Sequence, residues 1–415
     1  MNPLRFPLSW QILLAMLMAI LCGYMLPSIA NAIGNIGDLY IKLLSLVLIP
    51  SVVSNVINGV SYITKDGLLG RLTLKNLSWF VGSQFIAMVT AVVVANLIGA
   101  GNGAELYYSQ PKDFYGSVHN FGDFIINIFP DSIFNAFEVN NVVAVFVFCT
   151  CFGYFASRCS DKTRIFIKNM FTSISEIMQQ FVEFVAKLAP IGIFCVLTRV
   201  AADSILFSTV HNFMPFLFVV ALSLSVHSFV ILPSMVKVLT GKSAYKLMKM
   251  FGSVLYTAFG VRSSYAVVPQ VMSRMKKELG LSPRIADFVV PMGALTNYNG
   301  SAIYYCATAI FVSQAYGIEM SIFEYVMLFL SVSFISFGTS DIPLVGAVAI
   351  LPILDVIGLP KEGFAIIIVF DTLICMFTSF VDAWSNICAS AVIAGSEGEN
   401  LSKLDKIVIQ NPNYI

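Results

Sequence analysis

"FGSVLYTAFGVRSSYAVVPQVM" (residues 251–272) is an apolar stretch that the polar residues GVRSSY break at its centre. Lys246 and Lys249 precede it, and Arg274 and Lys276 follow it. Positively charged loops gather on the cytoplasmic side of a membrane protein, so both ends of this stretch are expected on that side. An apolar segment that returns to its own side is a re-entrant hairpin, whose polar tip is tolerated where protein or water surrounds it.

A second apolar stretch, "SVSFISFGTSDIPLVGAVAILPIL" (331–354), is broken at its centre by GTSDIP. Its flanking segments, 317–323 and 355–363, contain Lys361 as their one positive residue, which is typical of the outer face. Each broken stretch is followed by a turn with glycine, leucine and proline and then by a long apolar span. We therefore expect two hairpin-plus-helix units entering from opposite faces. In transporters such an inverted repeat surrounds the substrate and ions at the bilayer midplane.

The composition indicates a membrane protein. Of the 415 residues, 58% are hydrophobic and 11% are charged, whereas a soluble domain has about 25% charged residues. Runs such as 10–33 and 213–236 reach the roughly 20 apolar residues that a spanning helix needs. They are continuous rather than alternating, so helices are expected and not a barrel. The predicted fold class is an all-α polytopic membrane protein with eight transmembrane helices and two re-entrant helical hairpins.

The charge of the loops orients the spans. Positive residues gather in 65–75, 158–168 and 237–249, whereas 28–38 and 100–121 hold one lysine between them. This pattern predicts six spans before the first hairpin, with both termini of the chain in the cytoplasm. These spans are expected near 8–31, 39–62, 76–99, 122–157, 168–199 and 211–236. The first is too long for a removable signal peptide, so it is expected to remain as a span.

Other residue types exclude several classes of function. A net charge of +1 gives no indication of a nucleic-acid partner. The eight cysteines form no CxxC pair and lie mostly in apolar runs, which favours free, buried thiols. His227 lies within a span, where a hydrogen-bonded packing role is favoured over a proton relay. No nucleophile–base pair or metal constellation is evident, so an enzyme is not expected.

The last two long spans carry unusual polar residues. "GALTNYNGSAIYYCATAIF" (293–311) has Asn and Gly at its centre, although both are poor helix formers. In the final span, polar residues recur every three or four positions and share one helical face: Asp371, Cys375, Thr378, Ser379, Asp382, Asn386 and Ser390. Carboxylates within a span indicate a functional site. The alternative is that this face only packs against polar backbone of the hairpins.

These segments together resemble the dicarboxylate/amino acid:cation symporter family, which includes glutamate, aspartate and C4-dicarboxylate carriers. The resemblance covers nearly the whole chain, in order. It rests on LYIKLLSLVLIPSVVSNVINGV (39–60), LAPIGIF (188–194), VRSSYAVVP (261–269), GALTNYNGSAIY (293–304), FGTSDIP (337–343) and the last span. It implies a homotrimer in which a scaffold domain holds the trimer contacts. A transport domain then moves through the membrane like an elevator.

By this resemblance, the chain divides into two domains that alternate along the sequence. The scaffold would comprise 1–75 and 122–210, and the transport domain 76–121 and 211–415. Within the latter, the expected elements are hairpin 1 at about 250–278, span 7 at about 281–314, hairpin 2 at about 325–357 and span 8 at about 362–395.

The chain departs from the family pattern in the seventh span. The motif Asn-Met-Asp-Gly-Thr, whose Asp helps to hold sodium, is replaced by Asn-Tyr-Asn-Gly-Ser, which places Asn299 at the position of the Asp. In the third span, Phe80, Ser83 and Gln84 stand where Tyr, Thr and Ser usually help to bind the same ion. An amide does not neutralise a cation, so this sodium site is expected to be lost or altered.

The final helix departs as well. Cys375 stands where amino-acid carriers have the Asp that binds the substrate amine, and Thr378 stands where carriers of acidic substrates have an Arg. The usual Asn and Asp that follow are exchanged here for Asp382 and Asn386. One carboxylate is thereby shifted by about 6 Å along the helix axis.

The hairpin tips add two charged groups. Asp341 and the larger Leu344 and Val345 replace small residues at the second tip. Arg262 at the first tip matches an Arg of some family members. It could form a structural ion pair with Asp341 or with Asp382, or it could attract an anionic substrate.

The sequence therefore predicts a secondary active transporter for a small organic solute, most favourably an amino acid or dicarboxylate. Coupling by fewer sodium ions, or by protons on Asp382 or Asp341, is expected, with no organic cofactor and location in the plasma (inner) membrane. The alternatives are an uncoupled uniporter or exchanger and, less favoured, a non-transporting receptor. The expected substrate-binding residues are Arg262, Ser263, Ser264, Ser301, Thr339, Ser340, Asp341, Cys375, Thr378 and Asp382. The expected cation-binding residues are Gly293, Asn297, Asn299, Asp382 and Asn386.

Overall fold

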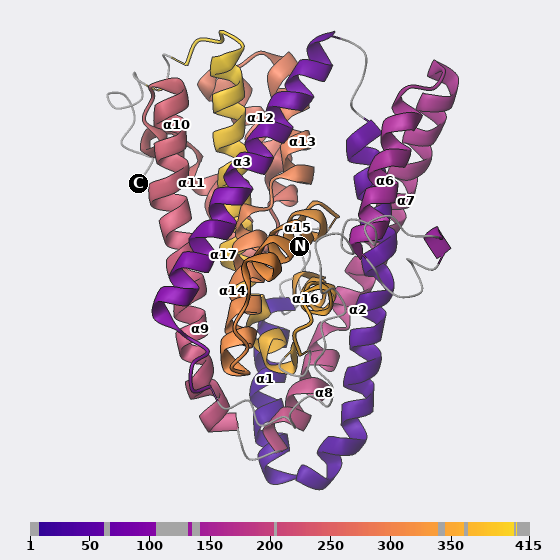
Figure 1. Ribbon diagram of the computed structural model, residues 1–415, viewed down its shortest axis with the longest axis vertical. Helices are drawn as coiled ribbons and strands as arrows, with labels where there is room; N and C mark the ends of the chain where they lie inside the picture. Colours follow the sequence, from indigo (N-terminus) through magenta and orange to yellow (C-terminus); the bar gives the residue numbers. More distant parts are fainter. Residues whose placement is uncertain are drawn as a thin grey trace, which may run out of the picture.

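The described part of the chain is helical throughout. The computed structural model describes residues 8–61, 67–104, 132–134, 142–202, 206–338, 345–360, 364–401 and 404, and these ranges contain no strand (Figure 1). The helices are α1 (Leu8–Met25), α2 (Pro27–Ser61), α3 (Gly67–Ile98), α6 (Val142–Ser157), α7 (Asp161–Lys187), α8 (Ala189–Ala202), α9 (Leu206–Val226), η1 (His227–Ile231), α10 (Leu232–Thr240), α11 (Ala244–Val261), η2 (Tyr265–Val267), α12 (Val268–Arg274), η3 (Met275–Leu279), α13 (Pro283–Thr296), α14 (Asn299–Ala315), α15 (Ile322–Gly338), α16 (Val345–Val356) and α17 (Phe364–Ser396).

The helices pack in two groups. In one, α1 and α2 lie against α8, and α2 also contacts α6 and α7. In the other, α14 packs against α3, α9 and α17, and α17 also contacts α10, α11 and α13. Figure 1 shows α2, α6 and α7 along one side of the molecule and α3, α10 and α11 along the other, with α15 and α16 between them. The division into a scaffold and a transport domain remains a prediction.

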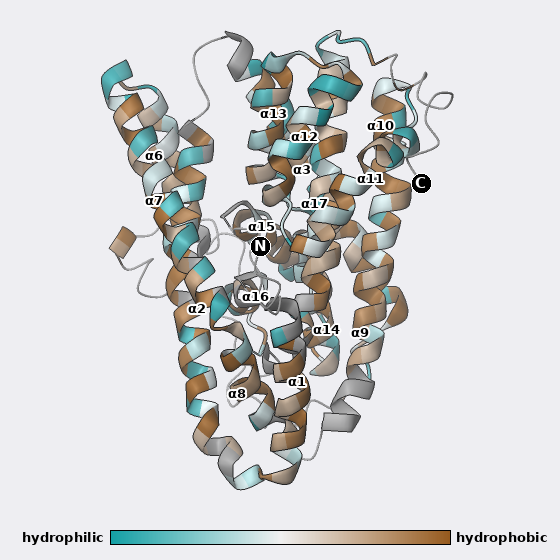
Figure 2. Ribbon diagram, turned by 180° about the vertical axis from the view of Figure 1, so that it is seen from behind, coloured by the Kyte–Doolittle hydropathy of each residue, from teal (hydrophilic) through white to brown (hydrophobic). Residues whose placement is uncertain are grey.

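Three of the described helical segments are long and apolar enough to cross a membrane: Gly70–Ile98, Phe213–Thr240 and Leu373–Ser396. A fourth crossing follows if Asp161–Val185 and Ala189–Arg199, which meet at 54°, form one bent span. The number of eight spans therefore remains a prediction. One reason is that the segment predicted as the seventh span is divided into two shorter helices, α13 and α14. Large apolar side chains also remain exposed on several helices, as expected of surfaces that face lipid. Hydrophobic residues predominate along much of α1 and α9 (Figure 2).

The first broken stretch folds as two helices joined by a sharp tip. α11 ends at Val261, and Arg262 follows with a φ of 60°, the one positive φ of a non-glycine residue among those described. The chain then continues through η2 into α12, which contacts α11. The second broken stretch has the same outline, since α15 and α16 contact each other on either side of residues 339–344, which lie outside the described ranges.

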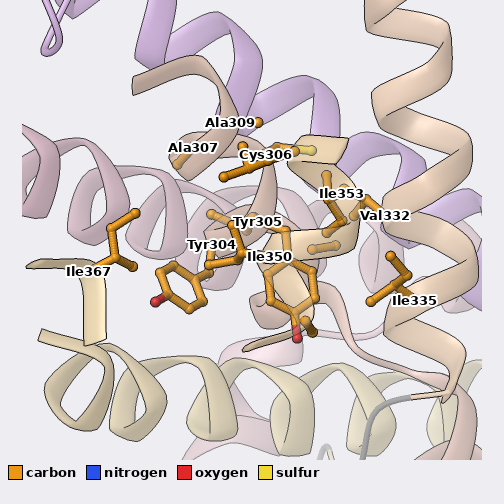
Figure 3. Packing of buried hydrophobic residues seen from close by; sticks show 14 of the residues in the cluster. Tyr304, Tyr305, Cys306, Ala307, Ala309, Val332, Ile335, Ile350, Ile353 and Ile367 are labelled. Atoms are coloured by element: carbon orange, nitrogen blue, oxygen red, sulfur yellow. The ribbon is translucent and has the colours of Figure 1, made fainter. Parts of the chain in front are cut away.

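The core between the two groups is built around α14. Tyr304 and Tyr305 project from this helix among Val332 and Ile335 of α15 and Ile350 of α16 (Figure 3). All five side chains are at most 3% exposed. Because such a core is as tightly packed as an organic crystal, it fixes the position of α14 relative to its neighbours.

The cysteines differ in part from the expectation of buried thiols. All eight are free, and Cys149, Cys195, Cys306 and Cys388 are buried. Cys151 and Cys159, however, are exposed. Two residues along a helix separate side chains by about 200°, so Cys151 faces outward when Cys149 faces the core.

Candidate functional site

Four segments meet where α13 gives way to α14. The break falls at Asn297 and Tyr298, whose backbone angles leave the helical region. Side chains of the polar face of α17 and of the π-helical turn η1 contact the residues around this break, and the tip between α11 and η2 contacts α17 through the carbonyl oxygen of Arg262. The predicted break in the seventh span and the polar face of the last span therefore lie together.

Asp382 of α17 caps the start of α14. Its Oδ1 accepts a hydrogen bond of 2.6 Å from the backbone N–H of Gly300, and its Oδ2 accepts one of 3.2 Å from Ser301 Oγ. A helix N-terminus has unpaired N–H groups and a partial positive charge, so a carboxylate is stabilised there. The carboxylate of Asp382 thus joins two helices, and it lies beside Ser301 as the sequence predicts.

A glycine makes this approach possible. A Cβ atom on Gly300 would lie 2.6 Å from the carbonyl oxygen of Thr378 on α17. Real Cβ atoms do not come this close to backbone, so any side chain here would push α14 away from α17. Thr378 itself donates through Oγ1 to the carbonyl oxygen of Cys375, at 3.2 Å, so its hydroxyl is turned along its own helix.

Three predicted cation ligands form an amide cluster, which we define as Gly293, Asn297 and Asn386. A Cβ on Gly293 would lie 2.0 Å from Asn386 Oδ1 and 3.3 Å from Asn297 Nδ2, so both amides lie against the glycine backbone. Asn386 Nδ2 donates to the carbonyl oxygen of Val290, at 2.9 Å. Both Asn297 amide atoms and Asn386 Oδ1 are buried without a hydrogen-bond partner among the described residues. The cluster therefore offers unused amide oxygens.

Arg262 at the first tip is a buried cation. Arg262 is 5% exposed, and its Nε and Nη1 atoms have no hydrogen-bond partner in the described part of the chain. The carbonyl oxygen of Arg262 lies 3.9 Å from Cys375 Sγ, which brings the tip against α17. Ser263 Oγ accepts from the backbone N–H of Ala266, at 3.2 Å, and Ser264 is buried.

A second group, the imidazole cluster, surrounds Asn299. We define it as Trp79, Ser83, His227, Asn299 and Ser385. Asn299 Nδ2 lies 2.9 Å from Ser385 Oγ and 3.2 Å from His227 Nε2, while Asn299 Oδ1 accepts from Ser83 Oγ at 3.3 Å. Trp79 Nε1 donates to Ser385 Oγ at 3.4 Å. The cluster joins α3, η1, α14 and α17.

Sequence analysis anticipated part of this arrangement. Gly293, Asn297 and Asn386 lie together, as do Ser301 and Asp382, and Arg262 meets Cys375. Thr339, Ser340 and Asp341 lie outside the described residues. The contact of His227 with Asn299 was missed, and the signal for it was a histidine flanked by serines within an apolar span. No group of three or more His, Cys, Asp and Glu residues that could hold a metal ion occurs in the described ranges.

Comparison with known proteins identifies the family. A model of the sodium:dicarboxylate symporter family matches residues 8–396, which include every element of the site. The chain belongs to the sodium:dicarboxylate symporter family. Members of this family are transporters and not enzymes, and the chain is an integral membrane protein.

The chain matches relatives in the sodium:dicarboxylate symporter family over nearly its whole length and theirs. The proton/glutamate-aspartate symporter of Escherichia coli (strain K12) is 28% identical over 99% of this chain and 100% of that protein. The proton/sodium-glutamate symport protein of Bacillus caldotenax is 27% identical over 95% of this chain and 96% of its own. The C4-dicarboxylate transport protein 2 of Mesorhizobium japonicum (strain LMG 29417 / CECT 9101 / MAFF 303099) is 27% identical, covering 96% and 91%.

Proposed function

We propose that this chain is a cation-coupled symporter for a small anionic solute, either an acidic amino acid or a C4-dicarboxylate, in the plasma membrane. The relatives are named for glutamate, aspartate and C4-dicarboxylates. The observation that carries the proposal is Arg262, a buried guanidinium with two nitrogen atoms that have no hydrogen-bond partner among the described residues. A buried charge is stable only when it is paired. A planar guanidinium also binds a carboxylate through two parallel hydrogen bonds.

The other residues at the site favour an anion without a strong requirement for an amine. Cys375 contacts the tip, the backbone of Thr378 lies against Gly300, and both side chains are neutral. The carboxylate of Asp382 is directed at Gly300 and Ser301. We propose that Arg262 binds one substrate carboxylate, and that Ser263, Ser264, Thr339, Ser340 and Asp341 shape the tips around it.

We propose that the amide cluster is the cation site. Neutral amide and carbonyl oxygens from interrupted helices coordinate sodium in transporters, and the oxygens of Asn297 and Asn386 are unused. Titration of Asp382 or Asp341 by protons is the second route to coupling. The homotrimer and the elevator motion are proposed from the family resemblance.

Thermal unfolding of the purified protein tests the substrate class. Glutamate, aspartate, succinate, malate and alanine are added in sodium, potassium or choline chloride at two pH values. A ligand at about 100 times its dissociation constant stabilises a protein by roughly 2.7 kcal/mol. We expect a solute with two carboxylates (glutamate, aspartate, succinate or malate), which we call the dianion whether or not it also carries an amine, to stabilise the wild type, and alanine to have no effect.

Arg262→Gln is the decisive variant for this proposal, and Arg274→Gln is its matched control. Arg274 lies at the other end of α12 and binds the carbonyl oxygen of Met250 and Ser253 Oγ. Arg262→Gln is expected to reduce the response to the dianion by at least half, since a hydrogen bond to a charged group contributes about 1.5–3 kcal/mol. Arg274→Gln is expected to keep the response. Equal responses in both variants would contradict the role of Arg262.

A further inference from the structure

The asparagines of the two polar clusters beside the helix break differ in how fully their hydrogen bonds are used. In the amide cluster, both amide atoms of Asn297 and the Oδ1 of Asn386 are buried without a partner among the described residues. In the imidazole cluster, by contrast, the side chain of Asn299 has a partner for each of its atoms. Only Tyr298 lies between Asn297 and Asn299 in the sequence. The difference in their hydrogen bonding therefore arises from the side chains that surround each of them in the fold.

The partners of Asn299 leave no oxygen for an ion. An amide has two N–H groups and one oxygen. The N–H groups point at His227 Nε2 and Ser385 Oγ, and the oxygen accepts from Ser83 Oγ. Asn299, Ser83, His227 and Ser385 are each 0% exposed. A monovalent cation needs several oxygens directed at it, and here it would face two N–H groups.

The π-helical turn η1 brings His227 into this position. Each hydrogen bond of a π-turn spans one residue more than that of an α-helix. The turn therefore redirects side chains and releases a carbonyl oxygen from the usual pattern. The carbonyl oxygen of Ser228 accepts a 3.0 Å hydrogen bond from Nε1 of Trp384, which is 0% exposed. Both His227 and Ser228 therefore attach η1 to the site helices, one through a ring nitrogen and one through backbone.

The imidazole is neutral in this arrangement. Since Asn299 Nδ2 donates to it, Nε2 of His227 carries a lone pair and the proton lies on Nδ1, which has no hydrogen-bond partner among the described residues. The titratable or charged residues on the helices that carry the cluster or pack against η1 are Arg71 and Lys75 of α3, His211 of α9, Lys237 of α10, Tyr304, Tyr305 and Cys306 of α14, and Asp371, Cys375, Asp382 and Cys388 of α17. Lys237 is exposed, and both carboxylate oxygens of Asp382 are directed at α14.

We propose that His227 seals the imidazole cluster, so that Asn299 is a positioning residue, and that the cation ligands lie in the amide cluster and not in the imidazole cluster. The neutral ring completes the hydrogen bonds of Asn299 and takes the place that an ion would need. This inference rests on the proposed cation coupling and deepens it, since it assigns the cation to one of the two clusters.

Matched amide-to-alanine variants test the assignment. The full-length protein is titrated with sodium chloride, and with protons at fixed choline chloride, while the midpoint of thermal unfolding is followed without substrate. Asn297→Ala is expected to raise the half-saturating cation concentration at least tenfold. Asn299→Ala is expected to lower the unfolding midpoint but to keep the half-saturating concentration within twofold of the wild type. A tenfold change in Asn299→Ala would overturn the proposal.

The same titration separates this inference from the proposed substrate. A protein that responds to the cation but to no dianion would overturn only the substrate assignment. A protein that responds to neither sodium nor protons would overturn cation coupling and, with it, the assignment of the cation to the amide cluster.

Nitrogen NMR of histidine provides a readout that does not depend on stability. The chain has three histidines, His119, His211 and His227, so selective ¹⁵N labelling gives few signals, and His227→Gln assigns the one of interest. We expect a protonated Nδ1 and an unprotonated Nε2 that stay unchanged between about pH 5 and pH 8, the range in which ordinary histidines titrate. They are also expected to be the same in sodium and choline. Titration in this range, or a shift on adding sodium, would overturn the seal.

Discussion

At the scale of single residues, the site depends on the absence of side chains as much as on their chemistry. Gly300 lets α14 approach α17 closely enough for its backbone N–H to reach Asp382, and Gly293 lets Asn386 lie against backbone. In both places the atom that a Cβ would meet lies within 2.6 Å. Glycine is required there for close approach, since neither residue has a positive φ.

Gly300→Ala is expected to destabilise the protein by about 1–3 kcal/mol, because the added methyl group overlaps the backbone of Thr378. Its substrate response is also expected to weaken as α14 moves. The matched control is Gly260→Ala in α11, where a Cβ would have no atom within 4 Å. There alanine is expected to be neutral or to stabilise by up to about 1 kcal/mol, through its helix propensity. Unfolding midpoints of both variants check the prediction, and equal midpoints would contradict it.

At the scale of elements, sequence reasoning succeeded where the pattern is local. The polar tip at Arg262, the helix break at Asn297 and the polar face of α17 follow from residue types within a few positions of each other. The π-turn η1 did not follow, since its geometry depends on contacts of Ser228 and His227 with residues from distant parts of the chain. The partners of Asn299 were missed for the same reason, because Ser83 and Ser385 are 302 residues apart in sequence.

The ends of α3 and α17 are joined outside the apolar region by Glu397. Its carboxylate contacts Lys75 Nζ at 2.5 Å and Arg71 Nη2 at 2.6 Å. The hydrogen bond from Lys75, and then that from Arg71, lower the pKa of Glu397 below its ordinary value. Stability from these pairs is therefore complete above the ordinary glutamate pKa of about 4.3 and is lost as the pH falls through the lowered value.

Glu397→Gln is expected to remove this loss of stability at acid pH. The variant should be less stable than the wild type near neutral pH, and the difference should shrink as the pH falls through the lowered pKa. Because Arg71 is 57% exposed, salt should also reduce the difference. Unfolding midpoints measured against pH at low and high salt check both effects. A difference that is constant with pH would show that the ion pairs do not stabilise the fold.

At the scale of the whole molecule, the helical membrane fold was predicted from the apolar runs and the charges of the loops. The family was predicted from the order of the motifs along the chain, and the family model confirms it. The number of spans, the domain division and the trimer remain predictions. These three features depend on the membrane and on further copies of the chain, and contacts within the described residues do not report on either.

Proteoliposomes with an imposed inward cation gradient distinguish a symporter from a uniporter. We expect the labelled dianion to accumulate above its outside concentration and to leave again when the gradient is collapsed. Asp382→Asn is expected to keep gradient-driven uptake if sodium is the coupling ion, and to lose the dependence on an imposed pH gradient if protons are. Uptake that only equilibrates the solute across the membrane would favour the uniporter.

The uneven exposure of the cysteines has a practical consequence for labelling the protein. Cys159 follows the end of α6 beside the charged Arg158, whereas Cys151, which is also exposed, lies within the apolar run of α6, and four of the other thiols are buried. A polar maleimide dye should therefore react first at Cys159 of the unaltered sequence. A dye there would mark the predicted scaffold as a fixed reference in single molecules, far along the chain from Arg262 and Asn297.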